Sequence, residues 1–405
     1  MISVMFHSAG LNNLRWRSSH ASEPLDKLKE KLEVIHQEGY RSVFMKEAAK
    51  YSGRTRDRTI HLTFDDGYLD NWVHIFPLLK KYGLKCTIFV SSDFIDPRSI
   101  TREKKYSYER DHDPIGCCAG FLSFDEMKQM EDSGLVEIQS HSKTHTWYFS
   151  SPEIVDFWHP GAGTEPLGPV WMVWNKFPQR KPFYHIEADK LENKIPYGTP
   201  VYSHGKSLET IRYLPDEEKL NEKLIELAES KNKEFFLKKG WRNEFRKIVD
   251  DFRKKHGLKG RHETRKEYLD RVALELSESK YKIEKGLGHS INGICWPGGA
   301  VTEDVLEIAK GTGYKYFTLP TKWKGNNRND AGMISRISNL PRLKVKGRNL
   351  GYPSRNDFKN YLRGRNGYIT GKWFYNLSRL GRLLKEELSL RRAGPDNIDG
   401  QIIRK

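Results

Sequence analysis

The sequence lacks any apolar stretch long enough to cross a bilayer. A membrane-spanning helix needs about 20 predominantly apolar residues, and no run among the 405 residues approaches that length. Residues 1–10 carry neither the basic start nor the apolar core of a secretory signal peptide. These absences predict a cytoplasmic protein, and they leave peripheral attachment to a membrane open.

Cysteine is also scarce. The chain has 4 cysteines, and none follows another at a spacing typical of a metal site. The adjacent pair Cys117 and Cys118 is a poor disulfide framework, so free thiols in a reducing compartment are expected. The scarcity argues against a secreted domain stabilised by disulfides.

Hydrophobic residues are few and basic residues are abundant. Hydrophobic residues make up 37% of the chain, but aromatic residues reach 12%, which argues against a disordered protein. We therefore expect a well-formed core with polar segments outside it. The formal net charge of +17 would suit nucleic acid, an anionic membrane surface or an acidic substrate.

Short apolar strands alternate with amphipathic helices at βα spacing, which predicts an α/β protein with a parallel sheet or barrel. In such folds the loops after the strands build the active site. Strands are predicted at 2–6, 41–45, 60–64, 86–90, 135–138 and 316–319, with a strand and loop at 291–299. Helices are predicted at 24–38, 70–81, 124–133, 269–285 and 303–310.

Three domains are predicted, with the barrel formed by residues 1–147 and 268–340. Residues 148–267 are rich in aromatic and then in charged residues, which predicts an insertion subdomain. Residues 341–405 form a basic C-terminal extension, since residues 342–405 hold 16 Lys and Arg against 5 Asp and Glu. Its leucines at helical spacing are typical of an amphipathic helix on an anionic membrane, although docking of the same stripe on the barrel stays open.

Candidate functional residues follow the predicted strands. Asp65 and Asp66 follow one strand, His141 and His145 follow another, and His7 ends the first. Two histidines and a carboxylate around an open position are the ligand set of a catalytic divalent metal, zinc above all. Each feature alone has an ordinary explanation, because aspartates cap helices and 14 histidines produce such spacings by chance. Their combination favours a metal-dependent enzyme.

The motifs Thr63-Phe64-Asp65-Asp66-Gly67 and His141-Ser142-Lys143-Thr144-His145 resemble those of the NodB-homology polysaccharide deacetylases, carbohydrate esterase family 4. The resemblance implies a distorted (β/α)7-type barrel that removes the N-acetyl group from an amino sugar. The substrate would be a surface polysaccharide, a glycolipid or a lipid-linked oligosaccharide. It implies Asp65 as catalytic base and a metal, Zn²⁺ or alternatively Co²⁺, Ni²⁺ or Mn²⁺, held by Asp66, His141 and His145.

The third motif of that family is altered here. Cys295-Trp296-Pro297-Gly298-Gly299 replaces the usual Arg-x-Pro-(Tyr/Phe)-Gly, so Cys295 stands where the family has the arginine that orients the base. The resemblance implies that Trp296, Pro297 and Gly298 contact the substrate or its oxyanion. No Leu-x-His follows residue 300. Instead, Val4-Met5-Phe6-His7-Ser8 resembles the start of the circularly permuted branch, which implies His7 as general acid.

Two other functions stay open. The missing arginine and the large insertion would suit a catalytically weak or inactive carbohydrate-binding descendant of the same fold. The charge would suit a nucleic-acid binder, but the basic residues cluster outside the expected cleft and no nucleic-acid motif appears. Nucleic acid is therefore not an expected partner. Four aromatic residues of the insertion could stack on sugars, although such residues more often form a core: Trp158, Trp171, Trp174 and Tyr184.

Overall fold

The computed structural model describes residues 1–11, 21–51, 57–103, 118–163, 168–320, 331–340 and 351–392, and the short strands at 344–345 and 348–349. Seven parallel strands close into a barrel in the order β1, β14, β13, β12, β7, β6, β5, and β5 pairs back with β1. This confirms the expected (β/α)7-type barrel. The strands are β1 (Ile2–Phe6), β5 (Thr59–Phe64), β6 (Cys86–Val90), β7 (Val136–Ser140), β12 (Gly293–Ile294), β13 (Tyr316–Leu319) and β14 (Met333–Ser338).

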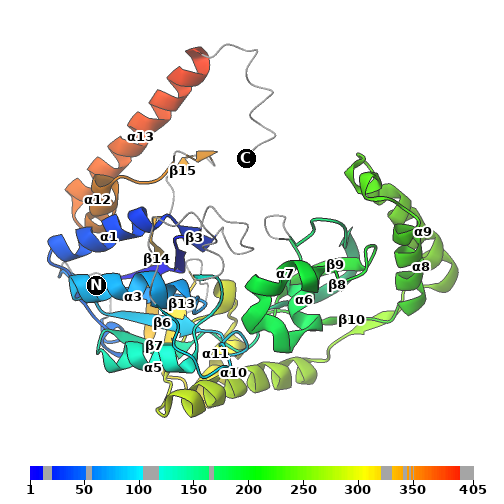
Figure 1. Ribbon diagram of the computed structural model, residues 1–405, viewed down its shortest axis with the longest axis horizontal. Coiled ribbons are helices and arrows are strands. Elements are labelled where there is room, and N and C mark those ends of the chain that lie inside the picture. Colours follow the sequence, from blue (N-terminus) through cyan, green and yellow to red (C-terminus); the bar gives the residue numbers. More distant parts are fainter. Residues whose placement is uncertain are drawn as a thin grey trace.

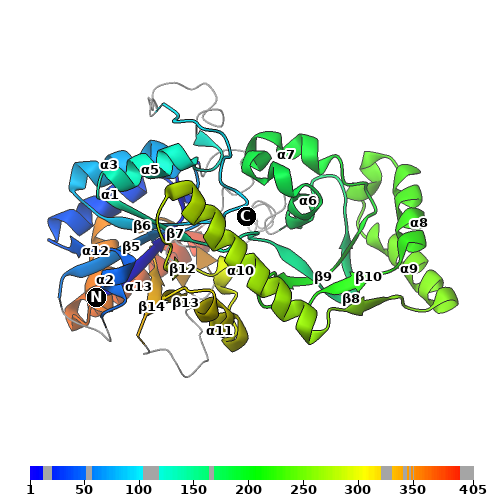
Figure 2. The same ribbon diagram turned by 90° about the horizontal axis from the view of Figure 1, so that it is seen from below.

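Helices cover the outside of the barrel, as Figures 1 and 2 show. Side chains of the strands and helices share one large core, in which Leu62, Ile88 and Ile138 are completely buried. The long α10 starts with a capping box of Thr264 and Glu267, which ties its first turn to the preceding loop. The helices are α1 (Leu25–Gln37), α3 (Phe76–Tyr82), α5 (Phe124–Asp132), α10 (Arg265–Leu287) and α11 (Glu303–Gly311).

Two predicted elements differ in the structure. The strand expected at 41–45 is only β4 (Arg41–Ser42), because a short helix, α2 (Met45–Ala48), begins where Glu137 accepts the Met45 N–H at 2.9 Å. The helix expected at 70–81 is a π-helix, η2 (Asn71–Ile75), followed by α3. Pro77 lies in the first turn of α3, where its missing N–H leaves no hydrogen bond unmade.

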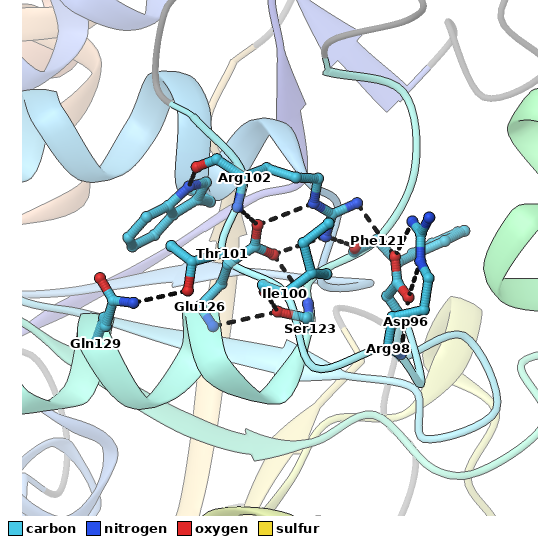
Figure 3. A network of polar contacts seen from close by, with 10 residues as sticks. Asp96, Arg98, Ile100, Thr101, Arg102, Phe121, Ser123, Glu126 and Gln129 are labelled. Atoms are coloured by element: carbon cyan, nitrogen blue, oxygen red, sulfur yellow. Dashed lines mark hydrogen bonds and ion pairs between the residues drawn. The ribbon is translucent and has the colours of Figure 1, made fainter.

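A polar network holds residues 96–103 against α5 (Figure 3). Arg102 donates to both oxygens of the buried Glu126 carboxylate, at 2.9 and 2.7 Å. Glu126 also accepts the N–H of Ser123, which completes a capping box at the start of α5. Arg102 lies 3.3 Å from Asp96 as well. The segment after β6 is thereby fixed beside the carboxyl ends of the strands.

The predicted insertion contains its own two cores. Its two longest strands, β8 (Trp147–Phe157) and β9 (Pro200–Lys206), pair antiparallel, although α6, η3 and α7 lie between them in the sequence. Trp158 and Tyr184 are buried in one of these cores, so they serve packing and not sugar stacking. Figure 2 shows α8 and α9 at the end far from the barrel. The remaining elements are α6 (Trp171–Lys176), η3 (Pro178–Phe183), α7 (Tyr184–Glu192), β10 (Tyr213–Pro215), α8 (Glu218–Glu229), η4 (Lys233–Leu237), α9 (Arg242–His256) and β11 (Gly260–His262).

The described part of the C-terminal extension is helical. Helix α12 (Arg355–Arg365) packs against α1, and α13 (Ile369–Arg392) packs against α12. In Figure 1, α13 projects away from the barrel. Among the described helices, none has both the length and the apolar character that crossing a membrane requires.

Candidate active site

The carboxyl ends of β1, β5, β7 and β14 open onto a cavity of about 930 Å³. Five candidate residues from the sequence line this cavity, although they come from three separate stretches of the chain: His7, Asp65, Asp66, His141 and His145. Because parallel strands end at the same rim of a barrel, this convergence follows from the fold. The first requirement of a shared catalytic site is therefore met.

Asp66, His141 and His145 converge on one point. The Nε2 atoms of His141 and His145 lie 3.2 and 3.1 Å from Oδ1 of Asp66. Asp66 Oδ1 is buried, and neither contact has the geometry of a hydrogen bond. Three ligand atoms this close together are the arrangement that a cation completes. The donor set therefore fits a divalent metal.

The backbone of Cys295 fixes the tautomer of His141. Nδ1 of His141 lies 2.9 Å from the Cys295 carbonyl oxygen, which can only accept, so Nδ1 carries the proton. Nε2 then presents its lone pair toward Asp66. Metal-binding histidines are usually oriented in this way by a partner on the other ring nitrogen.

The backbone is strained around the same point. Asp66, Ser142 and His145 have φ angles of 76°, 61° and 43°, in the left-handed region that residues other than glycine seldom adopt. Such conformations cost of order 1–3 kcal/mol each and persist where surrounding contacts enforce them. Two of the three strained residues are metal-ligand candidates, so the strain accompanies the aiming of their side chains.

Two buried charged residues outside the sequence motifs hold the loop between His141 and His145. Glu275 of α10 accepts hydrogen bonds from Thr144 Oγ1 at 2.8 Å and from Ser142 Oγ at 3.2 Å. Lys181 of the insertion donates to the carbonyl oxygen of Thr144 at 2.9 Å. Both the barrel helix and the insertion therefore fix this loop. Neither residue has a local sequence signal, because each acts through contacts far along the chain.

Asp65 has an arginine partner that the sequence analysis did not find. Nη1 of Arg336, on β14, donates to Asp65 Oδ1 at 2.6 Å, and both side chains are about nine-tenths buried or more. Burial alone would raise the pKa of Asp65, but Arg336 outweighs it and the pKa lies below the usual aspartate value. Arg336 thus fixes the orientation and ionisation of the predicted base.

Cys295 completes this contact. Nη2 of Arg336 donates to Cys295 Sγ at 2.8 Å, and the thiol lies 3.5 Å from Asp65 Oδ2. Burial raises the pKa of the Cys295 thiol well above its usual value, so the thiol stays neutral. Because the Cys295 side chain is small, the guanidinium of Arg336 reaches Asp65 from strand β14.

His7 is held through its backbone. Asn71 Nδ2 donates to the His7 carbonyl oxygen at 3.0 Å and to Asp70 Oδ1 at 2.9 Å. Asp70, which is fully buried, also accepts from Ser8 Oγ at 2.5 Å. Burial raises the pKa of Asp70 to about 7. The π-helix η2 thus fixes the loop that carries His7 along the cavity wall.

The third motif contributes less to the cavity than the resemblance implied. Trp296 and Gly298 line the cavity, whereas Pro297 is buried and is not among the lining residues. The indole N–H of Trp296 donates to the Thr318 carbonyl at 2.8 Å, so it is already engaged within the protein. A contact between substrate and Pro297 finds no support in this arrangement.

The insertion supplies an aromatic wall, which we define as Trp147, Trp171, Trp174 and His204. Trp171 and His204 have ring centroids 4.9 Å apart, and Trp174 meets His145 edge-on at 6.4 Å. Nε1 of Trp174 is buried and has no hydrogen-bond partner among the described residues. The wall therefore places aromatic rings beside the metal-ligand candidates.

Comparisons with known proteins agree with this site. Residues 52–157 match the family model described as polysaccharide deacetylase. This stretch of the chain is therefore similar to polysaccharide deacetylases. Over 146 residues it is 29% identical to YxkH of Bacillus subtilis (strain 168), whose name assigns it provisionally to the polysaccharide deacetylases. That match spans 35% of this chain and 42% of the relative's length.

Solved structures of deacetylases are also similar. A de-N-acetylase from Aggregatibacter actinomycetemcomitans is 16% identical with a TM-score of 0.47, over 83% of this chain and 93% of that one. The deacetylase domain of BpsB from Bordetella bronchiseptica is 20% identical with a TM-score of 0.46, over 84% of this chain and 95% of that one.

Proposed function

We propose that this chain is a metal-dependent N-deacetylase of an N-acetylated amino sugar. The observation that carries the proposal is the convergence of Asp66, His141 and His145 beside an aspartate that Arg336 keeps ionised. The metal ligands would hold Zn²⁺ first, with Co²⁺, Ni²⁺ or Mn²⁺ as alternatives. Lewis acidity toward water and the acetyl carbonyl is what a divalent cation supplies in such a site.

The residues of the chain would divide the remaining chemistry between them. Asp65, as general base, takes the proton of the attacking water, and Arg336 keeps its carboxylate aimed. His7, as general acid, gives a proton to the leaving sugar nitrogen as the amide C–N bond breaks. The products are acetate and a free amine. The lining of one cavity by both proton-transfer groups supports this division.

The substrate would be larger than a single acetylated sugar. The cavity of about 930 Å³ is extended by the aromatic wall of the insertion, whose rings suit the apolar faces of pyranoses. A surface polysaccharide, a glycolipid or a lipid-linked oligosaccharide would each fit this description.

A non-catalytic carbohydrate-binding role has lost its main support. That alternative rested on the missing arginine of the third motif, and Arg336 makes the corresponding contact with Asp65. A binding module would also have no use for a buried, ionised carboxylate beside a metal-ligand set.

Metal analysis and acetate release test the proposal together. We expect purified protein to bind about one divalent metal per chain, at Asp66, His141 and His145. It should also release acetate from N-acetylated chito-oligosaccharides or lipid-linked amino sugars. Chelation should abolish release, and added Zn²⁺ should restore it. Metal binding without acetate release from any acetylated sugar would leave the binding role instead, and absence of metal binding would refute the site itself.

A further inference from the structure

We propose that α13 docks on the surface of an anionic lipid membrane through an exposed apolar stripe, defined as Ile369, Trp373, Leu377, Leu380 and Leu384. These residues follow one another at intervals of three or four, so they lie along one side of the helix. Their exposed fractions run from 45% for Leu377 to 81% for Ile369. Phe374, at the edge of the stripe, is 49% exposed.

The stripe is not needed to hold α13 in place. The opposite face of α13 makes that contact, because Tyr375 packs on Tyr361 of α12 with ring centroids 5.4 Å apart. Arg382 on the same face lies 2.6 Å from Asp357, and Leu383 is 9% exposed. The alternative in which the stripe docks on the barrel is therefore wrong for these residues.

An apolar stripe of this length is unusual on a protein surface unless it meets something. Single exposed apolar side chains are ordinary, but a contiguous row marks an interaction site. Trp373 and the adjacent Phe374 suit a bilayer interface in particular, because indole and phenyl rings settle between headgroups and acyl chains. The stripe lies on a helix that projects from the barrel, so a flat surface can reach it (Figure 1).

Charge selects an anionic membrane over a second copy of the chain. Residues 351–385 contain eight Lys and Arg and one acidic residue, Asp357. Lys372 and Lys385 are exposed beside the stripe. Two such helices would repel each other, whereas anionic headgroups attract basic residues that lie near the surface. The same pairing of a basic flank with an apolar face is typical of interfacial helices.

Vesicle binding by the full chain tests the proposal. The probes are vesicles of phosphatidylcholine alone and vesicles of equal parts phosphatidylglycerol and phosphatidylcholine, each sedimented with the protein. We expect binding to the anionic vesicles only. The triple variant Trp373→Gln, Leu377→Gln, Leu380→Gln should reduce the apparent affinity by roughly tenfold or more, since three apolar anchors are lost.

A matched control removes exposed apolar side chains elsewhere. Leu274 and Tyr281 of α10 are 57% and 65% exposed, and the double variant Leu274→Gln, Tyr281→Gln should bind vesicles like the unchanged protein. Far-UV circular dichroism of each variant establishes that it has folded. Absence of vesicle binding by the unchanged protein overturns the proposal, as does full binding by the folded triple variant. A dimer in sedimentation equilibrium that the triple variant abolishes, without vesicle binding, would assign the stripe to a second copy instead.

Discussion

The barrel and the insertion both line one cavity, but they line it with different kinds of side chain. The barrel wall carries ionisable side chains, some of them with a fixed polar partner, such as Asp65 with Arg336. The insertion wall consists of aromatic rings in contact with one another, such as Trp171 and His204. A polar partner at hydrogen-bond distance fixes the orientation and ionisation of a side chain. An aromatic ring instead supplies shape and an apolar contact surface.

The two walls are therefore expected to have different roles in catalysis. Changes on the barrel wall should reduce the rate of the chemical step, because that wall holds the proposed metal and the proton-transfer groups. Changes on the insertion wall should weaken substrate binding and leave the chemical step almost intact. The predictions below test this division, beginning with the largest expected effect.

Replacing Asp65 with asparagine should reduce kcat by about 10² to 10⁴, the usual contribution of a general base. The side chain keeps its shape and loses its ability to take a proton. Metal content should be unchanged, because Asp65 is not in the converging set of Asp66, His141 and His145. Acetate release measured beside metal content checks both expectations. His141→Ala is the matched contrast and should lose the metal; an Asp65→Asn variant of unchanged kcat would remove Asp65 from its role.

Loosening the loop between the two histidines should lower metal affinity. Glu275→Ala removes the acceptor for Thr144 and Ser142, and we expect affinity to fall by about 10- to 100-fold, as for other partners of metal ligands. Competition with a metal-binding dye measures this. Asp270→Ala, which removes an exposed carboxylate of the same helix that pairs with Lys266 and not with the loop, is the control. Equal metal affinity in the two variants would mean that Glu275 contributes only to packing.

Replacing Arg336 with lysine should lower kcat by about 10- to 100-fold, by analogy with partners that orient catalytic groups. One ammonium cannot reproduce the two directed contacts to Asp65 and Cys295. Because Arg336 lowers the pKa of Asp65, its loss should also move the acidic limb of the pH profile of kcat/KM to higher pH. A variant with lower kcat and an unmoved acidic limb would contradict this account.

Arg336 is a site residue that the sequence did not predict. Buried strands with continuous apolar runs, such as Cys86–Val90, were predicted correctly. Strand β14 reads Met-Ile-Ser-Arg-Ile-Ser, and its polar residues interrupt the apolar run that marks a buried strand. Two of them, Arg336 and Ser338, line the cavity. Its place between β13 and β1 depends on pairing across the whole chain. The motif residues could be predicted because they are local, whereas the partner of Asp65 comes from 271 residues away.

The same limit applies to the insertion. Its aromatic content was apparent in the sequence, but only the fold separates Trp158, which is buried in a core, from Trp174, which lines the cavity. Glu275 and Lys181 likewise resemble ordinary charged residues until the fold places them beside the His141–His145 loop. The motif residues that line the cavity could therefore be identified from the sequence, whereas the residues that orient them could not.

Asp70 predicts a pH dependence of stability. Its pKa is raised to about 7 by burial, so the folded protein holds this proton more tightly than the unfolded chain does. The stabilising contribution is complete below about pH 4 and is lost as pH rises through 7, with an upper limit on the order of 4 kcal/mol. Urea unfolding on either side of pH 7 should show the free energy of unfolding falling with pH. Asp70→Asn, which is neutral throughout, should flatten the difference; an unchanged pH dependence in that variant would contradict the prediction.

The insertion wall should give the smallest kinetic effect. Trp174→Ala removes a ring face of the cavity, and we expect KM to rise by roughly 2- to 13-fold, from the ~0.5–1.5 kcal/mol that an aromatic contact contributes. The value of kcat should change less than KM, because Trp174 meets His145 only edge-on and belongs to neither the metal-ligand set nor the proton-transfer pair. Trp174→Phe keeps a smaller aromatic face and loses the N–H. Its KM should therefore lie between that of the unchanged protein and that of Trp174→Ala. Steady-state kinetics on acetylated oligosaccharides of increasing length measure both constants. A fall in kcat as large as that of Arg336→Lys would show that the two walls do not divide the work.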